Sequence, residues 1–76
     1  MKPTFEQALG NALRRRRVAL GYSQETFADE ISMHRTYYSA IERGEKNLQI
    51  DTLRRVCTGL QVPAWQVLRE ADAESA

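Results

Sequence analysis

The chain carries, from Ser23 to Gly44, the stretch SQETFADEISMHRTYYSAIERG, which predicts two short helices joined by a tight turn. Ser23 stands just before the first helix, where its side-chain oxygen caps free backbone N–H groups. Phe27, Ala28 and Ile31 follow at helical spacing and form one apolar face. The first helix is therefore expected to begin after Ser23 and to bury that face.

The second helix is expected over about His34 to Arg43, after a short turn around residues 32–33. Tyr38 and Ile41 lie three residues apart and form a narrow apolar stripe. Gly44 follows directly and favours the left-handed backbone that ends many helices. Together the two elements predict a helix-turn-helix over about residues 23–43.

The face opposite that stripe is short, polar and cationic. A step of about 100° per residue places Thr36, Ser39, Ala40 and Arg43 on it, with Arg35 at its N-terminal edge. Arg binds a guanine edge through two hydrogen bonds, Thr and Ser donate or accept, and the methyl groups of Ala and Thr suit a thymine methyl. A helix that reads the DNA major groove needs these residue types, so Arg35, Thr36, Ser39 and Ala40 are the expected base readers.

The two adjacent tyrosines divide between the faces. Tyr38 lies on the stripe with Ile41 and is expected in the core. Tyr37 points to the flank, where two readings stay open. It is either another core aromatic or a ring along the groove wall that senses a flexible pyrimidine–purine step through DNA shape. Tyr37 is therefore a further candidate for base reading.

Three further helices complete an all-α fold of five helices in a single domain over residues 1–76. They are expected over Phe5 to Leu20, Ile50 to Gly59, and about 63–70, followed by a flexible tail over 71–76. In the first two of these, Leu20 and Ile50 belong to the apolar stripes expected to face the core. Pro63 suits the start of the last helix, because its missing N–H has no partner there in any case.

Composition excludes several classes of protein. A domain of 76 residues buries only about 60% of the surface that its unfolded chain exposes, so dimerisation would stabilise it. One Cys and one His supply neither a zinc site nor an internal disulfide, so no metal or cofactor is expected, and Cys57 is expected to be a buried apolar residue. No signal peptide or membrane-length apolar run is present, which favours a cytoplasmic protein without a membrane partner.

Catalysis is not expected either. Ser23, Ser32 and Ser39 have no His and Asp companions at suitable positions, so the chain is expected not to be an enzyme. The net charge of +1 is small, but Arg and Lys gather in the centre of the chain, and the local field attracts a phosphate backbone.

The segment and most of the chain around it resemble the phage-repressor-like helix-turn-helix family (the Xre family), which includes lambda repressor and Cro. The resemblance covers about residues 8 to 68 without a gap, and it rests on Gly21-Tyr22-Ser23-Gln24-Glu25, Phe27-Ala28, Ile41-Glu42-Arg43-Gly44, Leu53 and Leu60-Gln61-Val62. Within the family, the chain looks most like the small controller proteins of restriction-modification systems, on the basis of Arg35-Thr36-Tyr37 with Ser39, Ile41-Glu42-Arg43 and Asn47-Leu48.

The resemblance implies roles for particular residues. Arg17 matches a basic position that pairs with Glu42, so an ion pair is expected to lock the first helix to the third. Gln24 matches a residue that donates to a DNA phosphate while it braces the start of the recognition helix. Arg43, Lys46 and Asn47, at and beyond the end of that helix, are the other expected phosphate contacts.

The last helix is expected to mediate assembly. Trp65, Val67 and Leu68 provide a large aromatic and two aliphatic side chains that either cap the core or form a twofold interface. The resemblance implies that this helix pairs with its symmetry mate. Two recognition helices would then lie about 34 Å apart and read a pseudo-palindromic operator.

These observations predict a homodimeric regulator of transcription that binds double-stranded DNA, and the resemblance points to a controller protein. An antitoxin or a phage-type repressor would have nearly the same sequence, and a protein-interaction module that has lost DNA binding is an alternative of another class. Glu25, Asp29 and Glu30 cluster on the first helix of the motif. They serve either solubility or contact with RNA polymerase. No small-molecule ligand is evident.

Overall fold

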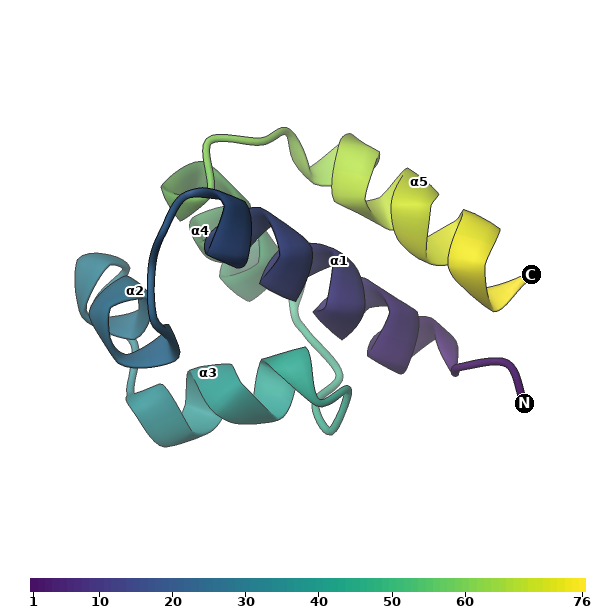
Figure 1. The fold of residues 1–76 in the computed structure, drawn as a ribbon, viewed down its shortest axis with the longest axis horizontal. Helices are drawn as coiled ribbons and strands as arrows, with labels where there is room; N and C mark the ends of the chain where they lie inside the picture. The colour runs from purple at the N-terminus through teal and green to yellow at the C-terminus, as the bar shows by residue number, and fades with distance from the viewer.

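The computed structural model describes residues 1–76 and contains five helices and no strands, as the sequence predicts. Figure 1 shows α1 in the middle of the molecule, with α5 along one side and α3 along the other. None of the five helices has the length and apolar character that a membrane span requires. Their bounds are α1 (Phe5–Ala19), α2 (Gln24–Glu30), α3 (Arg35–Glu42), α4 (Ile50–Gly59) and α5 (Ala64–Ser75).

Side-chain caps fix where three of the helices begin. Thr4 and Ser23 open α1 and α2 with capping boxes, and the Ser23 hydroxyl accepts a hydrogen bond from the N–H of Thr26 at 3.0 Å, as expected. His34 caps α3, because its Nδ1 accepts from the N–H of Thr36 at 3.1 Å. The start of the predicted recognition helix is therefore set by local chemistry.

The core takes one apolar face from each helix. The largest side chains buried in it are those of Leu13, Phe27, Tyr38, Val56 and Val67. The rings of Phe27 and Tyr38 lie 5.1 Å apart in a tilted arrangement, which is a favourable geometry for an aromatic pair. This contact packs α2 directly against α3 and holds the two helices of the motif at a fixed angle.

A close approach of backbones joins α1 to α3. A Cβ added at Gly10 would lie 2.7 Å from the carbonyl oxygen of Ile41, a distance that real Cβ atoms do not reach. Only glycine fits at Gly10 without a shift of one helix away from the other. The position of α3 on the body of the protein is therefore tightly constrained at this end.

The last helix differs from the prediction. The sequence placed its end near residue 70 and a flexible tail over 71–76, whereas α5 continues to Ser75. Ala71 is buried against the core, and Glu74 accepts hydrogen bonds from Asn11 and Arg15. These tertiary contacts with α1, which runs beside α5 in the opposite direction in Figure 1, extend the helix beyond the point where its apolar pattern weakens.

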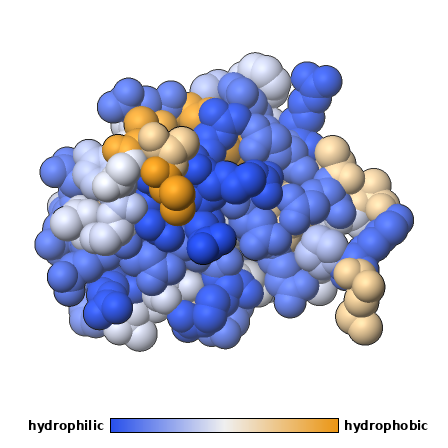
Figure 2. Space-filling view, viewed as in Figure 1, coloured by the Kyte–Doolittle hydropathy of each residue, from blue (hydrophilic) through white to orange (hydrophobic).

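Two residues that the sequence assigned to apolar stripes are exposed. Leu20 caps the end of α1, and Ile50 is the first residue of α4. Both lie at helix ends that no neighbouring helix covers, so periodicity alone placed them wrongly. The face of the molecule seen in Figure 2 is mostly hydrophilic, including the part over α3 at the bottom of the view.

Candidate nucleic-acid interface

The recognition helix α3 presents a polar, cationic outer face. Arg35, Thr36 and Ser39 line a surface hollow together with Arg43, and the first two of them are exposed. The spacing of four residues from Arg35 to Ser39 and from Ser39 to Arg43 puts these side chains on one side of the helix. The structure thus brings together four of the residues that the sequence assigned to DNA contact.

The sequence predicted an exposed Ala40 on the outer face of α3, but the structure buries this residue. It is only 6% accessible, although it does not belong to the main cluster of core residues. It lines a second hollow beside the longer side chains of Thr36, Tyr37, Arg43 and Lys46. These neighbours screen its short side chain, which a helical projection of the sequence does not reveal.

The two tyrosines lie in different environments, and of the two readings left open for Tyr37 the position in the core is wrong. Tyr38 is fully buried in the core, whereas Tyr37 is 37% accessible and packs outside it. The Lys46 ammonium lies 5.6 Å from the centre of the Tyr37 ring, within the range of a cation–π contact. Tyr37 and Lys46 therefore form one flank of the outer face of α3, with Asn47 exposed beyond them in the loop.

Arg43 is held by two partners at the end of α3. Its Nε and Nη2 donate to the two carboxylate oxygens of Glu45 at 3.0 and 3.1 Å, and its Nη1 donates to the Ser39 hydroxyl at 2.6 Å. The hydrogen bond to Glu45 raises the pKa of Arg43, and the same bond lowers the pKa of Glu45. The pair is therefore fully ionised at neutral pH.

Glu45 is the contact residue that sequence reasoning missed. From the sequence alone, an acidic side chain beside a DNA-binding helix is most simply interpreted as a solvated charge. Glu45 also lies beyond Gly44, where helical spacing no longer predicts which side chains are neighbours. The available signal was the pair of opposite charges two residues apart across a helix end. The left-handed turn at Gly44 folds the chain back so that the two side chains meet.

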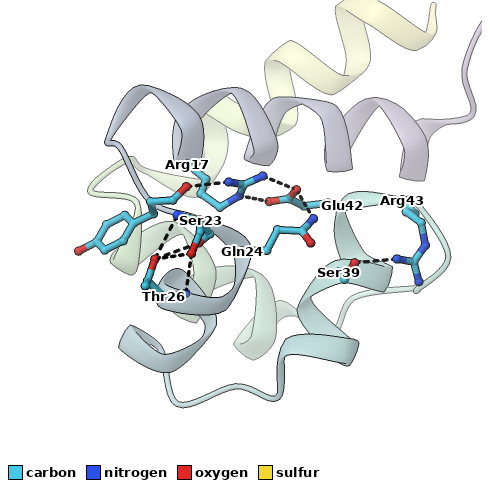
Figure 3. Close-up of polar contacts among 8 residues, drawn as sticks. Arg17, Ser23, Gln24, Thr26, Ser39, Glu42 and Arg43 are labelled. Atoms are coloured by element: carbon cyan, nitrogen blue, oxygen red, sulfur yellow. Dashed lines mark hydrogen bonds and ion pairs between the residues drawn. The ribbon is translucent and has the colours of Figure 1, made fainter.

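The predicted ion pair between α1 and α3 is confirmed (Figure 3). The Arg17 Nε and Nη2 donate to the Glu42 carboxylate at 2.7 and 3.0 Å, and Arg17 Nη1 donates to the carbonyl oxygen of Tyr22 at 2.7 Å. The side chains of Arg17 and Glu42 are only 9% and 2% accessible. Such a buried two-point contact ties α1, the α1–α2 turn and the end of α3 together.

Gln24 supports this cluster from α2. Its Nε2 donates to Glu42 Oε1 at 2.9 Å, so it braces the end of α3, whereas the resemblance implied the start. Figure 3 shows the Gln24 side chain reaching from the start of α2 to the Glu42 carboxylate at the end of α3. A Gln amide carries two N–H donors, so one remains for a phosphate.

The Glu42 carboxylate is kept charged in spite of its burial. Burial alone would raise its pKa, but the hydrogen bonds from Arg17 and Gln24 and the positive charge of Arg17 outweigh this effect, and the pKa is lowered. The same contact with Glu42 raises the pKa of Arg17. Burial raises the pKa of the nearby Tyr38 hydroxyl, which has no hydrogen-bond partner in the protein.

The residues assigned to the dimer interface do not share one environment. Val67 is fully buried in the protomer's own core, so it cannot contact a second copy, and the sequence assignment is wrong at this position. The physical reason is that α5 packs along α1, so the side of α5 that carries Val67 faces the core. Trp65 is 61% accessible and Leu68 is half-buried at the edge of the core.

The remaining candidate residues lie outside the outer face of α3. Glu25, Asp29 and Glu30 are all exposed on α2. Cys57 is buried in the core as expected, and burial raises the pKa of its thiol to about 11. No group of three or more His, Cys, Asp and Glu side chains is arranged to hold a metal ion.

Known proteins are similar to this chain in both sequence and fold. Residues 13–64 match the sequence pattern of a helix-turn-helix family. Control protein C.MunI of Mycoplasma sp is 35% identical over 66 residues, which cover 86% of this chain and 89% of that protein.

Two solved structures are similar over almost the whole chain. The clp gene regulator ClgR from C. glutamicum has a TM-score of 0.92 at 33% identity, with 100% of this chain and 97% of that chain covered. The restriction-modification controller protein C.Esp1396I, solved as a tetramer in complex with its natural 35 base-pair operator, has a TM-score of 0.81 at 27% identity, with 96% of each chain covered. The pattern match over most of the chain, the sequence identity to C.MunI and the arrangement of α2 and α3 agree, and the chain belongs to this helix-turn-helix family.

Proposed function

We propose that this protein is a sequence-specific DNA-binding regulator of transcription that acts as a homodimer. The observation that carries the proposal is the outer face of α3, where Arg35, Thr36, Ser39 and Arg43 line one exposed hollow. In this arrangement α3 enters the major groove and its N-terminal residues meet base edges. The mechanism is occupancy of an operator, with no chemical step. Since the ligand is operator DNA, the protein acts in the cytoplasm.

Base reading falls to Arg35 and Thr36, with Ser39 beside them and the Tyr37 ring against the groove wall. Arg35 stands in the first turn of α3, where a long side chain reaches the groove floor. Ala40 contributes at most a recessed methyl group, because its neighbours cover it.

Positioning falls to residues around the helix. Gln24 has a free amide N–H after it binds Glu42, and Lys46 and Asn47 are exposed in the loop that follows α3. Contacts from these residues to phosphates would set the register of α3 on the duplex and carry no sequence information themselves.

Dimerisation is assigned to the exposed part of α5. Trp65 and Leu68 offer apolar surface that the protomer does not bury completely. A twofold axis there would place two copies of α3 about one helical turn of DNA apart, about 34 Å. The similar protein C.Esp1396I forms a tetramer in complex with its operator, which supports assembly on DNA.

The most specific form of the proposal is a controller of a restriction-modification system, which C.MunI and C.Esp1396I support. A regulator of other bacterial genes is the second candidate, because the ClgR structure matches 100% of this chain. Genes for a methyltransferase and an endonuclease next to this one would favour the first candidate. In either case the exposed acidic residues Glu25, Asp29 and Glu30 are available to contact RNA polymerase beside a promoter.

The experiment compares a base reader with a phosphate contact. Sites are selected from random duplexes with the wild-type protein, and affinities for a selected and a scrambled duplex are measured across a salt series. Arg35→Ala is expected to reduce the ratio of the two affinities by about 5- to 150-fold, the range of a bidentate guanine contact. Lys46→Ala is expected to weaken both duplexes alike and to reduce the salt slope by about one.

Failure of the wild-type protein to enrich any sequence would contradict the proposal itself. An intact affinity ratio in Arg35→Ala would instead make Arg35 a phosphate contact and move base reading to Thr36, Tyr37 and Ser39. Sedimentation of Trp65→Ala, with circular dichroism to check its fold, tests the dimer interface separately.

A further inference from the structure

The Arg43 guanidinium is oriented before any DNA is bound. Glu45 accepts from two of its nitrogens at 3.0 and 3.1 Å, and Ser39 accepts from the third at 2.6 Å (Figure 3 shows the contact with Ser39). A guanidinium carries five N–H donors, so three are used and two remain, one on each terminal nitrogen. Two donors on neighbouring nitrogens are what a bidentate contact to guanine O6 and N7 requires.

Arg43 also lies on the surface that faces the base edges. It shares one hollow with Arg35, Thr36 and Ser39 and therefore belongs to the same side of α3. The eight-residue step from Arg35 to Arg43 corresponds to about 12 Å along the helix axis. The two arginines thus reach different base pairs of one half-site.

The charge of the pair argues against a phosphate contact. A phosphate is held by net positive charge, but the Glu45 carboxylate neutralises Arg43 and would itself face the phosphate. The edge of guanine is uncharged and offers two acceptors, so a neutral pair with two free donors suits it better. As an exposed ion pair, the contact adds little to folding stability, and its effect lies in holding a long side chain in one orientation.

We infer that Arg43 reads a guanine and that Glu45 is a positioning residue that aims it, in place of the phosphate contact that the sequence suggested for Arg43. The inference rests on the proposed function, since it requires α3 in the major groove. It adds a second guanine to the half-site, at the end of α3 opposite to Arg35.

The test is a comparison of base preferences. Wild type, Arg43→Lys and Glu45→Gln are each used to select sites from the same pool of random duplexes. Arg43→Lys keeps the charge and loses the planar fork, and Glu45→Gln keeps the shape and loses the bidentate acceptor. Both are expected to lose the preference for guanine at the same single position of the half-site, by about tenfold or more, with the other positions unchanged.

Glu30→Gln is the matched control, because it removes one exposed carboxylate from α2 without touching Arg43. It is expected to raise the affinity for all duplexes slightly and to keep every base preference. Arg43→Lys is expected to keep the wild-type salt slope, since the number of positive charges near the DNA is unchanged.

Two results would overturn the inference. If Glu45→Gln binds all duplexes more tightly with unchanged base preferences, Glu45 merely masks Arg43. If Arg43→Lys keeps the full guanine preference, Arg43 acts only as a charge. Both results leave the proposed function intact, whereas the absence of any selected sequence with wild-type protein defeats the proposed function first.

Discussion

Helix α1 makes ionic contacts on two sides, and the two sides are chemically alike but physically different. Toward α3, Arg17 is bound to Glu42 in the interior. Toward α5, Arg15 and Arg16 are bound to Glu70, and Arg15 also to Glu74, where the side chains are partly exposed. All three arginines belong to the run at residues 14–17, so their separate environments come from the helical phase alone.

The comparison teaches that an arginine–glutamate pair has no fixed value. At the partly exposed contacts, the charges keep part of their hydration in the folded protein, so forming the pairs changes the free energy of unfolding less. In the interior, each charge has lost its water and depends on the other, so the loss of one partner is costly. The buried pair of α1 holds the recognition helix, whereas the partly exposed contacts hold the second half of α5.

The largest effect is expected at the buried pair. Arg17→Met or Glu42→Leu leaves one buried charge without its partner and is expected to lower the free energy of unfolding by about 3–5 kcal/mol. The double variant removes both charges and is expected to lose much less than the sum of the two single changes. Chemical denaturation of the four proteins measures this coupling, with Arg15→Met as the surface control on the same helix.

Strict additivity in the double variant would contradict the expected coupling between the two charges. If either single variant does not fold, recovery of a cooperative transition in the double variant still demonstrates the coupling. The free energy of unfolding of the control variant Arg15→Met has to stay close to that of wild type. Otherwise the proposed difference between the two sides of α1 is wrong.

A smaller effect is expected on the acid side of the stability curve. The pKa of Glu42 in the folded protein lies below its ordinary value of 4.5, so the carboxylate stabilises the fold above that pH. This contribution is lost as the pH falls from about 4.5 through the lowered pKa, because the unfolded chain binds the proton first. Glu42→Gln should therefore flatten the fall in stability below pH 4.5, measured by denaturation at a series of pH values.

Glu74 is the control for this measurement. Its pKa is also lowered, by hydrogen bonds from Asn11 and Arg15, but its carboxylate is at the surface. Glu74→Gln is expected to leave most of the acid dependence in place. If stability depends less on acid pH in Glu74→Gln than in Glu42→Gln, the α5 side of α1 contributes more to the acid dependence than the α3 side, contrary to the expectation.

The smallest effect is expected at the partly exposed contacts with α5. Glu70→Gln removes the carboxylate that Arg15 and Arg16 share and is expected to change the free energy of unfolding by less than about 1 kcal/mol. What remains of the effect should shrink in high salt, since exposed charges are screened. Thermal denaturation at low and high salt checks this, and a loss comparable to that of Arg17→Met would show that the α5 side is as important as the α3 side.

The sequence predicted the local parts of the fold well. The capping serine at Ser23, the apolar stripe of Tyr38 and Ile41, and Gly44 are short-range signals, and they placed α2 and α3 to within a residue or two. The ion pair of Arg17 and Glu42 followed from resemblance and is present. Local hydrogen bonding and periodicity decide the helix bounds, so they can be read from neighbouring residues.

The sequence failed where distant segments meet. The end of α5 depends on contacts between residues 11–15 and 70–74, and the burial of Val67 depends on the packing of α5 along α1. Ala40 was misjudged because it is buried in a hollow that is also lined by Lys46, which lies beyond α3 in the sequence.

By itself the sequence determined the number and type of helices, the helix-turn-helix and the polar face of α3, because each of these follows from propensity, capping and a 3.6-residue period. Only the tertiary structure decided where α5 ends and that Val67 is buried in the core of its own protomer, and only it revealed that Glu45 holds Arg43. These features depend on how segments approach one another in space, where burial and distance set the strength of every charge and hydrogen bond.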